Sequence, residues 1–262
     1  MEYLGYFLSI IIGLSLGLIG GGGSILAVPI LVYLFKIHPE QATSYSLFIV
    51  GITAMFGSYS HYKLGNLKIK AALIFALPSV VSLLFVRDFI LPKIPSIVFT
   101  LNDFSVTKNL MIMVVFAFLM IAASLSMIRE SIPKERVKRD DSLRIAIIGL
   151  LVGFITGFLG AGGGFLIIPA LLFFGNLPMK QAIGTSLLII FINSLIGFGG
   201  DVLNGSEINY NLLFTISSIA LLGMFIGTYL SKKIDGEKLK PAFGWFVLVM
   251  GIYVIIKEFF IK

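Results

Sequence analysis

Two glycine clusters are the part of the sequence whose spacing best fits a binding chemistry. The first comprises Gly20, Gly21, Gly22, Gly23 and Ser24, and the second Gly160, Ala161, Gly162, Gly163 and Gly164. Runs of glycine destabilise helix, so each cluster predicts a break followed by a restarting helix, over 24–35 and 165–173. Free N–H groups and the positive dipole end of a restarting helix attract an anion. The alternative is that the glycines only permit tight helix packing.

A second polar cluster follows each glycine cluster at matching positions. Its members are Gln41, Thr43, Ser44, Tyr45 and Ser46 in one copy and Gln181, Thr185 and Ser186 in the other. Their hydroxyl and amide groups could line a path for the anion. The alternative is ordinary helix capping, for which Ser and Thr are preferred. Asn193 and Thr53 lie deeper, at equivalent positions. An amide at that depth more often joins helices than binds substrate, although its symmetric position keeps Asn193 among the candidate binding residues.

Few ionisable residues fall within the apolar segments. His61 and Asp201 occupy equivalent positions at predicted helix ends, where either would serve as a coupling residue for a proton or sodium ion. The alternative is that both are interfacial loop residues, because intramembrane placement is what would make them functional. Arg87 and Asp88 are interpreted as a local pair without a role. With no Lys or Arg predicted at mid-depth, backbone N–H groups and hydroxyls would have to hold an anion.

Catalytic and cofactor chemistry finds little support in the residue types. The chain has no cysteine, and its two histidines lack partners at metal-ligand spacing, so no metal site or cofactor is expected. The glycine clusters lack the lysine of a phosphate-binding loop and the sixth-position glycine of a dinucleotide site. No Ser/His/Asp, dicarboxylate or HExxH constellation lies in the apolar segments, so the sequence argues against an enzyme.

Composition defines the elements that must position these residues. Of 262 residues, 58% are hydrophobic and 13% are charged, and mean hydropathy is +1.03. A soluble domain carries about 25% charged residues, so a soluble enzyme, a nucleic-acid binder and a disordered chain are excluded in favour of an all-α polytopic membrane protein. The N-terminus has no Lys or Arg before its apolar run, which argues against a cleaved signal peptide.

An internal repeat organises the chain. With a shift of 140 residues, GLIGGGGSILAVPIL (17–31) aligns with GFLGAGGGFLIIPAL (157–171), and 14 of the 45 positions in 17–61 are identical. The repeat predicts two homologous transmembrane halves, 1–128 and 145–262, separated by a charged cytoplasmic linker, 129–144.

The apolar segments suggest how each half crosses the bilayer. Segments 42–60, 71–91, 108–128, 182–200, 211–230 and 242–261 each fit one crossing of about 20 residues. Segments 3–35 and 145–175 are too long for one crossing and contain the glycine clusters, so each predicts two short helices. If both form hairpins, 14 Lys and Arg lie at one face and 6 at the other. The positive-inside rule then places 129–144 and 231–241 in the cytoplasm, both termini outside, and the halves in an inverted repeat.

The paired glycine blocks, each followed by QAxxxSL, resemble the sulfite exporter TauE/SafE family of membrane permeases over essentially the whole chain. The resemblance implies a multi-pass protein of the cytoplasmic membrane that transports a small sulfur-containing anion, such as sulfite, sulfoacetate or a related sulfonate. The chain departs from that pattern in 66–89, which lacks a glycine-rich helix, whereas 221–233 keeps it. An uncoupled anion channel and a permease for a non-sulfur organic anion are the alternatives. The expected partners are the anion, the lipid bilayer and a coupling ion, with no nucleic acid.

Overall fold

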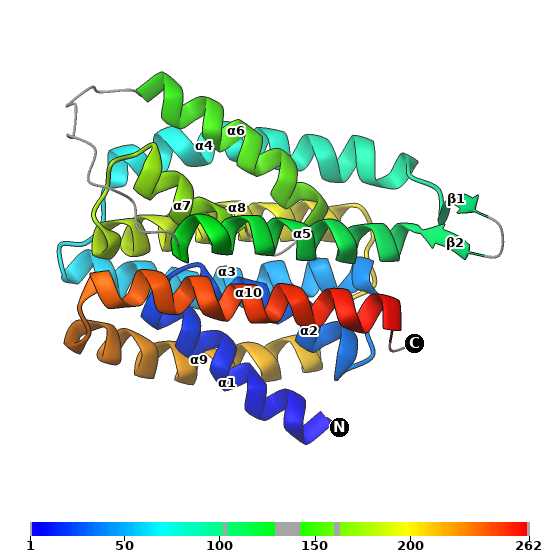
Figure 1. Ribbon diagram of the computed structural model, residues 1–262, viewed down its shortest axis with the longest axis horizontal. Coiled ribbons are helices and arrows are strands. Elements are labelled where there is room, and N and C mark those ends of the chain that lie inside the picture. Colours follow the sequence, from blue (N-terminus) through cyan, green and yellow to red (C-terminus); the bar gives the residue numbers. More distant parts are fainter. Residues whose placement is uncertain (1, 102–103, 129–141, 160–162, 261–262) are drawn as a thin grey trace.

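The computed structural model describes residues 2–101, 104–128, 142–159 and 163–260 (Figure 1). It is an all-α polytopic architecture, as the composition predicts. The first part of the chain forms helices α1 (Glu2–Ile19), α2 (Gly22–Tyr33), α3 (Pro39–Lys63), α4 (Ile69–Phe85) and α5 (Lys108–Ile128). The second part forms α6 (Ser142–Leu159), α7 (Gly164–Phe173), α8 (Met179–Leu203), α9 (Tyr210–Lys233) and α10 (Gly236–Phe260).

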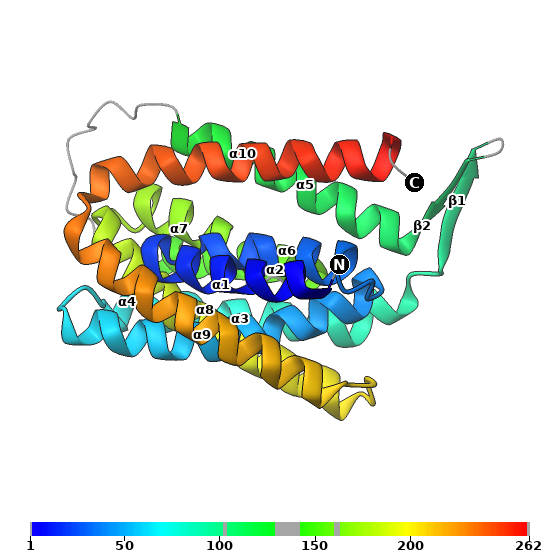
Figure 2. The ribbon, with the colours of Figure 1, turned by 90° about the horizontal axis from the view of Figure 1, so that it is seen from below.

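A short irregular region separates α4 from α5. It consists of a π-helical turn η1 (Val86–Ile90), a 3₁₀ turn η2 (Leu91–Lys93) and strands β1 (Ile97–Leu101) and β2 (Phe104–Thr107). The strands pair antiparallel, with Leu101 opposite Phe104. This β-ribbon, which the sequence reasoning did not anticipate, projects beyond the helices (Figure 2).

Five stretches of the described chain are long and apolar enough to cross a membrane as helices. They are Ile69–Lys93, Lys108–Leu125, Ser142–Leu159, Met179–Leu203 and Tyr210–Lys233. Helices α3 and α10 have 25 residues each, about 38 Å at about 1.5 Å per residue, and lie alongside the others (Figure 1).

Both long apolar segments are broken where the glycines predict. Helix α1 ends at Ile19, Gly20 takes a left-handed conformation (φ +82°), and α2 begins at Gly22. In the second half, Gly163 takes the left-handed conformation (φ +65°) directly before α7. Glycine adopts such a backbone without steric strain, and the chain can therefore reverse inside the protein.

The same local turns recur 140 residues apart. Lys36 and Asn176 both have positive φ, and so do Gly65 and Gly205. The backbone N–H of residue 37 donates to the carbonyl of residue 31, and that of 177 donates to 171. The two parts of the chain therefore repeat loop geometry as well as sequence.

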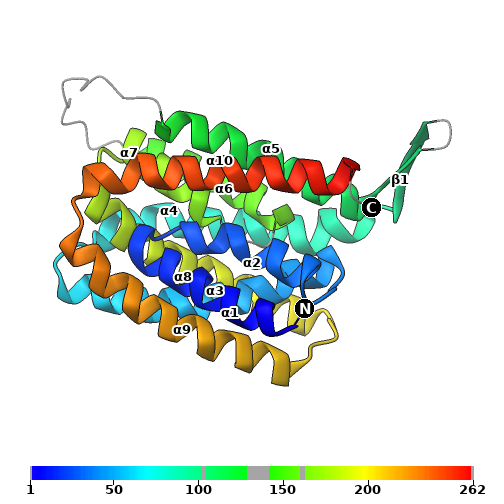
Figure 3. The same cartoon turned by 60° about the horizontal axis from the view of Figure 1, so that its bottom comes forward.

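Glycines spaced four residues apart bring helix backbones into direct contact. Helix α1 lies along α9, where Gly13 and Gly17 meet the backbone of α9 and Gly223 and Gly227 meet the backbone of α1 (Figure 3). Helix α6 packs on α4 in the same manner through Gly149, Gly153 and Gly157. Although α4 lacks the corresponding glycines, it presents small buried residues, Ala72, Ala76 and Ser79. Close approach is thus preserved by glycines on one helix of the pair.

The loops gather at two ends of the helical body. One end, here called the β-ribbon end, carries loop 34–38, the region 86–107 and loop 204–209 (Figure 1). The other, called the α5–α6 end, carries the end of α5, the start of α6 and loops 64–68, 174–178 and 234–235. The α1–α2 pair opens toward the β-ribbon end and the α6–α7 pair toward the α5–α6 end. The count of Lys and Arg at the two faces assumed these loop positions, with each long apolar segment forming a hairpin. The inverted relation of the two halves stays a prediction.

Candidate functional site

The two glycine breaks meet inside the protein. Gly21 lies against the backbone of Gly164. The two are so close that a Cβ added to either glycine would overlap the backbone of the other. The N-terminal ends of α2 and α7 therefore face each other, as two restarting helices at one depth would. Positions 160–162, which include the candidates Gly160, Ala161 and Gly162, lie outside the described residues.

The described part of the first break is closely packed. A Cβ on Gly20 would lie 2.9 Å from the Ser186 hydroxyl oxygen, and one on Gly23 would overlap the carbonyl of Ile12. The Ser24 hydroxyl donates to the Gly21 carbonyl at 2.7 Å, so it helps to fix the break. Tight packing by these glycines is thus observed directly, and it places one candidate path hydroxyl, that of Ser186, beside the break.

The polar residues at the starts of α3 and α8 do not cap these helices. The N-cap positions are His38 and Pro178, and neither makes a side-chain capping bond. Instead, Thr43, Ser46 and Ser186 donate to carbonyls three residues earlier, and Thr185 accepts from the backbone N–H of Lys68 at 3.1 Å. The capping interpretation is wrong because the caps fall ahead of the polar residues, which lie within the first turns.

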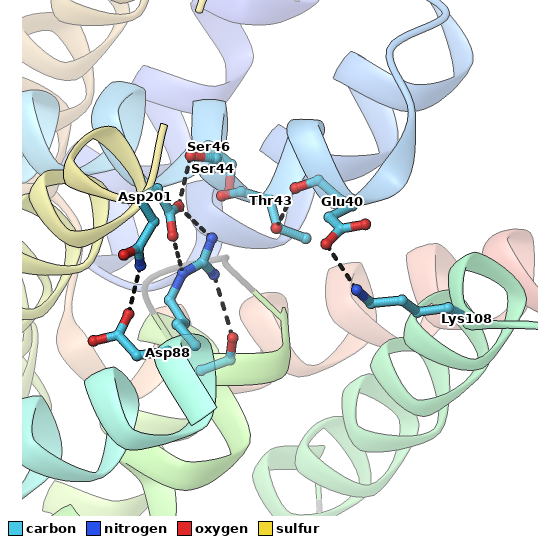
Figure 4. Close-up of polar contacts among 10 residues, drawn as sticks. Glu40, Thr43, Ser44, Ser46, Asp88, Lys108 and Asp201 are labelled. Atoms are coloured by element: carbon cyan, nitrogen blue, oxygen red, sulfur yellow. Dashed lines mark hydrogen bonds and ion pairs between the residues drawn. The ribbon is translucent and has the colours of Figure 1, made fainter. Parts of the chain in front are cut away.

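Ser44 belongs to a buried ion-pair cluster at the β-ribbon end. The Arg87 guanidinium binds both carboxylate oxygens of Asp201. Its Nε donates to Oδ1 at 2.7 Å, and its Nη2 donates to Oδ2 (Figure 4). The Ser44 hydroxyl donates to Asp201 Oδ2 at 2.6 Å, and Arg87 Nη1 donates to the Gly157 carbonyl at 3.2 Å. The cluster joins α3, η1, α6 and α8, and therefore both halves of the chain.

This cluster corrects two sequence interpretations. Arg87 and Asp88 do not form a local pair, because Asp88 accepts instead from the Asn204 amide at 2.8 Å. Asp201 is not a loop residue, since it lies in α8 and is 8% exposed. His61 likewise lies in the last turn of α3, at 2% exposure. Neighbours in sequence point to different partners here because successive side chains of a helical turn project in different directions, so that Arg87 is buried and Asp88 is exposed.

A cavity of about 700 Å³, here called the ion-pair cavity, opens beside the cluster. Its lining is mostly polar: His38, Glu40, Gln41, Ser44, Tyr45, Arg87, Asp88, Leu91, Pro92, Asn109, Asp201, Asn204, Ser206 and Glu207. Acidic groups outnumber basic ones in this lining, and Lys108 pairs with Glu40 at 2.7 Å (Figure 4). Gln41 and Ser44 thus line a cavity as the path interpretation predicts, whereas Gln181 is half-buried on the first turn of α8.

A smaller pocket of about 240 Å³, here called the histidine pocket, lies at the α5–α6 end. It is lined by His61, Leu64, Asn66, Lys180, Ile183, Ser231 and Lys232. Neither ring nitrogen of His61 has a hydrogen-bond partner among the described residues.

Comparison with known proteins identifies the family. The model of the family described as "Sulfite exporter TauE/SafE" matches residues 6–254. The chain belongs to this TauE/SafE family. It is 30% identical to a probable membrane transporter protein of Xylella fastidiosa strain Temecula1, over 94% of this chain and 91% of that protein. It is 27% identical to the probable membrane transporter protein YdhB of Bacillus subtilis, over 94% and 96%.

A further relative, a probable membrane transporter protein of the archaeon Methanocaldococcus jannaschii, is 27% identical over 95% of both chains. No solved structure matches this TauE/SafE family member. The family and the apolar helices together make it a multi-pass membrane transporter of the cell membrane.

Asn193 joins helices in this TauE/SafE protein, which confirms the commoner role of a mid-span amide. Its Nδ2 donates to the Ser79 hydroxyl at 2.7 Å, which links α8 to α4. Its Oδ1 has no partner among the described residues, while Thr53, at the equivalent position in α3, donates to the Ile49 carbonyl. Arg87 is the functional candidate that sequence reasoning missed. The available signal was an arginine at the end of an apolar run, since such a cation needs a buried partner.

Proposed function

We propose that this TauE/SafE family member is a secondary transporter that moves a small sulfur-containing anion, such as sulfite, sulfoacetate or a related organosulfonate, across the cytoplasmic membrane. The anion is held by backbone amides at the paired glycine breaks near the midplane. The observation that carries the proposal is the contact between Gly21 and Gly164, which brings the N-terminal ends of α2 and α7 together.

The chemistry of helix ends supports an anion at this place. The first N–H groups of α2 and α7 have no carbonyl one turn earlier within their helices, and both dipoles present a positive end. Discontinuous membrane helices with facing N-termini recur in secondary transporters, where they bind anionic groups. The buried cation Arg87 is already paired with Asp201 at the β-ribbon end, so the break needs another source of positive potential, and the amides supply it.

A thermal-shift screen of the purified protein tests the substrate class. Sulfite, sulfate, thiosulfate, sulfoacetate and taurine are compared with carboxylates of similar size. A ligand at 100 times its Kd stabilises the folded state by about 2.7 kcal/mol, so a selective rise in Tm is expected with the sulfur anions. Equal or larger shifts with the carboxylates would favour the permease for a non-sulfur organic anion.

Flux into liposomes separates a carrier from an uncoupled channel. A carrier saturates, shows counterflow and stays near or below about 10³ turnovers per second, by analogy with ordinary catalytic rates. Imposed proton and sodium gradients then identify the coupling ion, for which Asp201 and His61 are the candidate residues. Flux that rises linearly with concentration and shows no counterflow would contradict the carrier and support a pore.

Substitution at the start of α2 tests the site itself. Gly22→Val adds a branched side chain at the first helical residue of α2, and it is expected to abolish sulfite binding at the break and so to lower the number of sulfite ions bound per protein. Gly199→Ala is the matched control, because a Cβ at Gly199 meets nothing within 4 Å. Folding is followed by Tm and binding by equilibrium dialysis. A folded Gly22→Val protein that binds as many sulfite ions as Gly199→Ala, and with the same affinity, would show that the break is not the site.

A further inference from the structure

The ion-pair cavity and the histidine pocket are lined by equivalent positions of the 140-residue repeat, although they lie at opposite ends of the protein. Six of the seven positions that line the histidine pocket have a counterpart in the ion-pair cavity. Positions 61, 64, 66, 180, 231 and 232 correspond to 201, 204, 206, 40, 91 and 92. The two hollows are therefore the same place in the two repeats.

The charges of the two hollows are reversed. Asp201 corresponds to His61, Glu40 corresponds to Lys180, and Pro92 corresponds to Lys232 in the smaller pocket. Among the described residues, no acidic side chain lines the histidine pocket, whereas four line the ion-pair cavity. A local excess of positive charge in a partly enclosed pocket favours a negatively charged ligand.

His61 lacks the partners that satisfy its counterpart. Asp201 is bound by Arg87 and Ser44, but the equivalent positions in the other repeat are Gly227 and Gly184, which have no side chains. At 2% exposure, neither ring nitrogen of His61 has a hydrogen-bond partner of ordinary distance and angle among the described residues, although the Gly17 backbone lies near the ring. A buried polar group left unpaired costs about 1–3 kcal/mol, and a ligand that accepts from the ring N–H would remove this cost for one of the two nitrogens.

We propose that the histidine pocket binds a small oxyanion at the α5–α6 end of the protein. The ammonium groups of Lys180 and Lys232 supply the charge, His61 donates a ring N–H, and the Asn66 amide completes the donor set. The pocket of about 240 Å³ has room for roughly eight waters at about 30 Å³ each, which exceeds the needs of an oxyanion of four or five heavy atoms. The inference rests on the proposed anion transport and adds an entry site on the face predicted to be cytoplasmic.

Equilibrium dialysis with radiolabelled sulfite and sulfate tests the pocket in full-length protein in phosphatidylcholine nanodiscs. The double variant Lys180→Gln/Lys232→Gln is expected to raise the dissociation constant of one of the two proposed sulfite sites at least tenfold, and His61→Gln to raise it severalfold. Lys233→Gln is the matched control, because Lys233 is exposed beside Lys232 on the same helix and stacks on Tyr229. The sulfite affinity of the Lys233→Gln variant should stay within twofold of that of the wild type. Lys232→Gln alone, at an exposed position, provides a second variant whose fold should be intact.

Three results would overturn the proposal. The first is that the wild type binds neither anion, and the second is that the double variant and Lys233→Gln bind sulfite with equal affinity. The third is that sulfite binding is lost when phosphatidylglycerol is added, which would assign the pocket to a lipid headgroup. Liposome flux separates this proposal from the transport proposal. Sulfite that binds with the expected variant pattern but is not transported contradicts transport alone. Sulfite that is transported equally by all variants contradicts the pocket alone.

Discussion

At the scale of single residues, the Arg87–Asp201 pair has the clearest energetic consequence. Both side chains are buried, at 6% and 8% exposure, and each is the other's main compensation for lost hydration. Removing one member of a buried pair leaves an uncompensated charge, which typically costs about 3–5 kcal/mol, whereas removing both leaves no charge unpaired. The pair therefore ties α8 to η1 strongly only while both residues are present.

We expect Arg87→Gln and Asp201→Asn each to lower the free energy of unfolding by about 3–5 kcal/mol, and the double variant to lose less than the sum of the two. Denaturant unfolding in mixed micelles measures all three. Asp88→Asn is the control, since Asp88 is exposed and should change stability by no more than about 0.5 kcal/mol. Additive losses in the double variant would show that the pair is not coupled.

At the scale of elements, the glycines of α1, α6 and α9 determine how closely the helices approach. A Cβ on Gly223 would overlap the carbonyl of Ile10 on α1, and the helices would have to separate to admit it. In a membrane, where lipid is as apolar as the helix faces, such close backbone contact is a main source of association.

Gly223→Ala should therefore destabilise the protein by about 1–3 kcal/mol, the usual range for overpacking. Gly199→Ala on α8 makes the same chemical change where nothing lies within 4 Å. Alanine is favoured over glycine in a helix, so this variant should be unchanged or stabilised by up to about 1 kcal/mol. Tm values measured in one detergent compare the two directly. Equal Tm values for Gly223→Ala and Gly199→Ala would refute close packing between α1 and α9.

The elements also show what sequence can and cannot predict here. The helices, the two breaks and the glycine contacts follow from local composition and spacing, which a single chain displays. The inward turn of Arg87 and its pairing with Asp201, 114 residues away, depend on how α4 and α8 pack. The burial of His61 has the same origin, because it lies at a helix end that only tertiary packing covers. Matching positions 61 and 201 in the repeat selected these two residues without revealing their surroundings.

At the scale of the whole molecule, equivalent helices pair across the two halves. Helix α3 packs on α8, α5 on α10 and α2 on α7, while α1–α9 and α6–α4 are equivalent cross-pairs (Figures 2 and 3). In the predicted inverted repeat, loops of one half lie at the end opposite to their counterparts, and the repeated hollow is present at both ends. Divergence of charge between the copies then gives each face its own chemistry, acidic at the β-ribbon end and basic at the other.

The sidedness of this arrangement gives the last prediction. Of the 20 Lys and Arg residues, the predicted hairpin arrangement assigns 14 to the face of the α5–α6 end, so the positive-inside rule predicts that this end lies in the cytoplasm. The native chain has no cysteine, so a single introduced thiol is the only reactive one. Glu207→Cys at the β-ribbon end should react with a membrane-impermeant maleimide in intact cells, and Asp235→Cys only after permeabilisation. Both positions are exposed, so accessibility alone would not distinguish them. If Asp235→Cys reacts in intact cells and Glu207→Cys only after permeabilisation, the orientation is the opposite of the predicted one. If both variants react in intact cells, the two ends do not lie on opposite faces of the membrane.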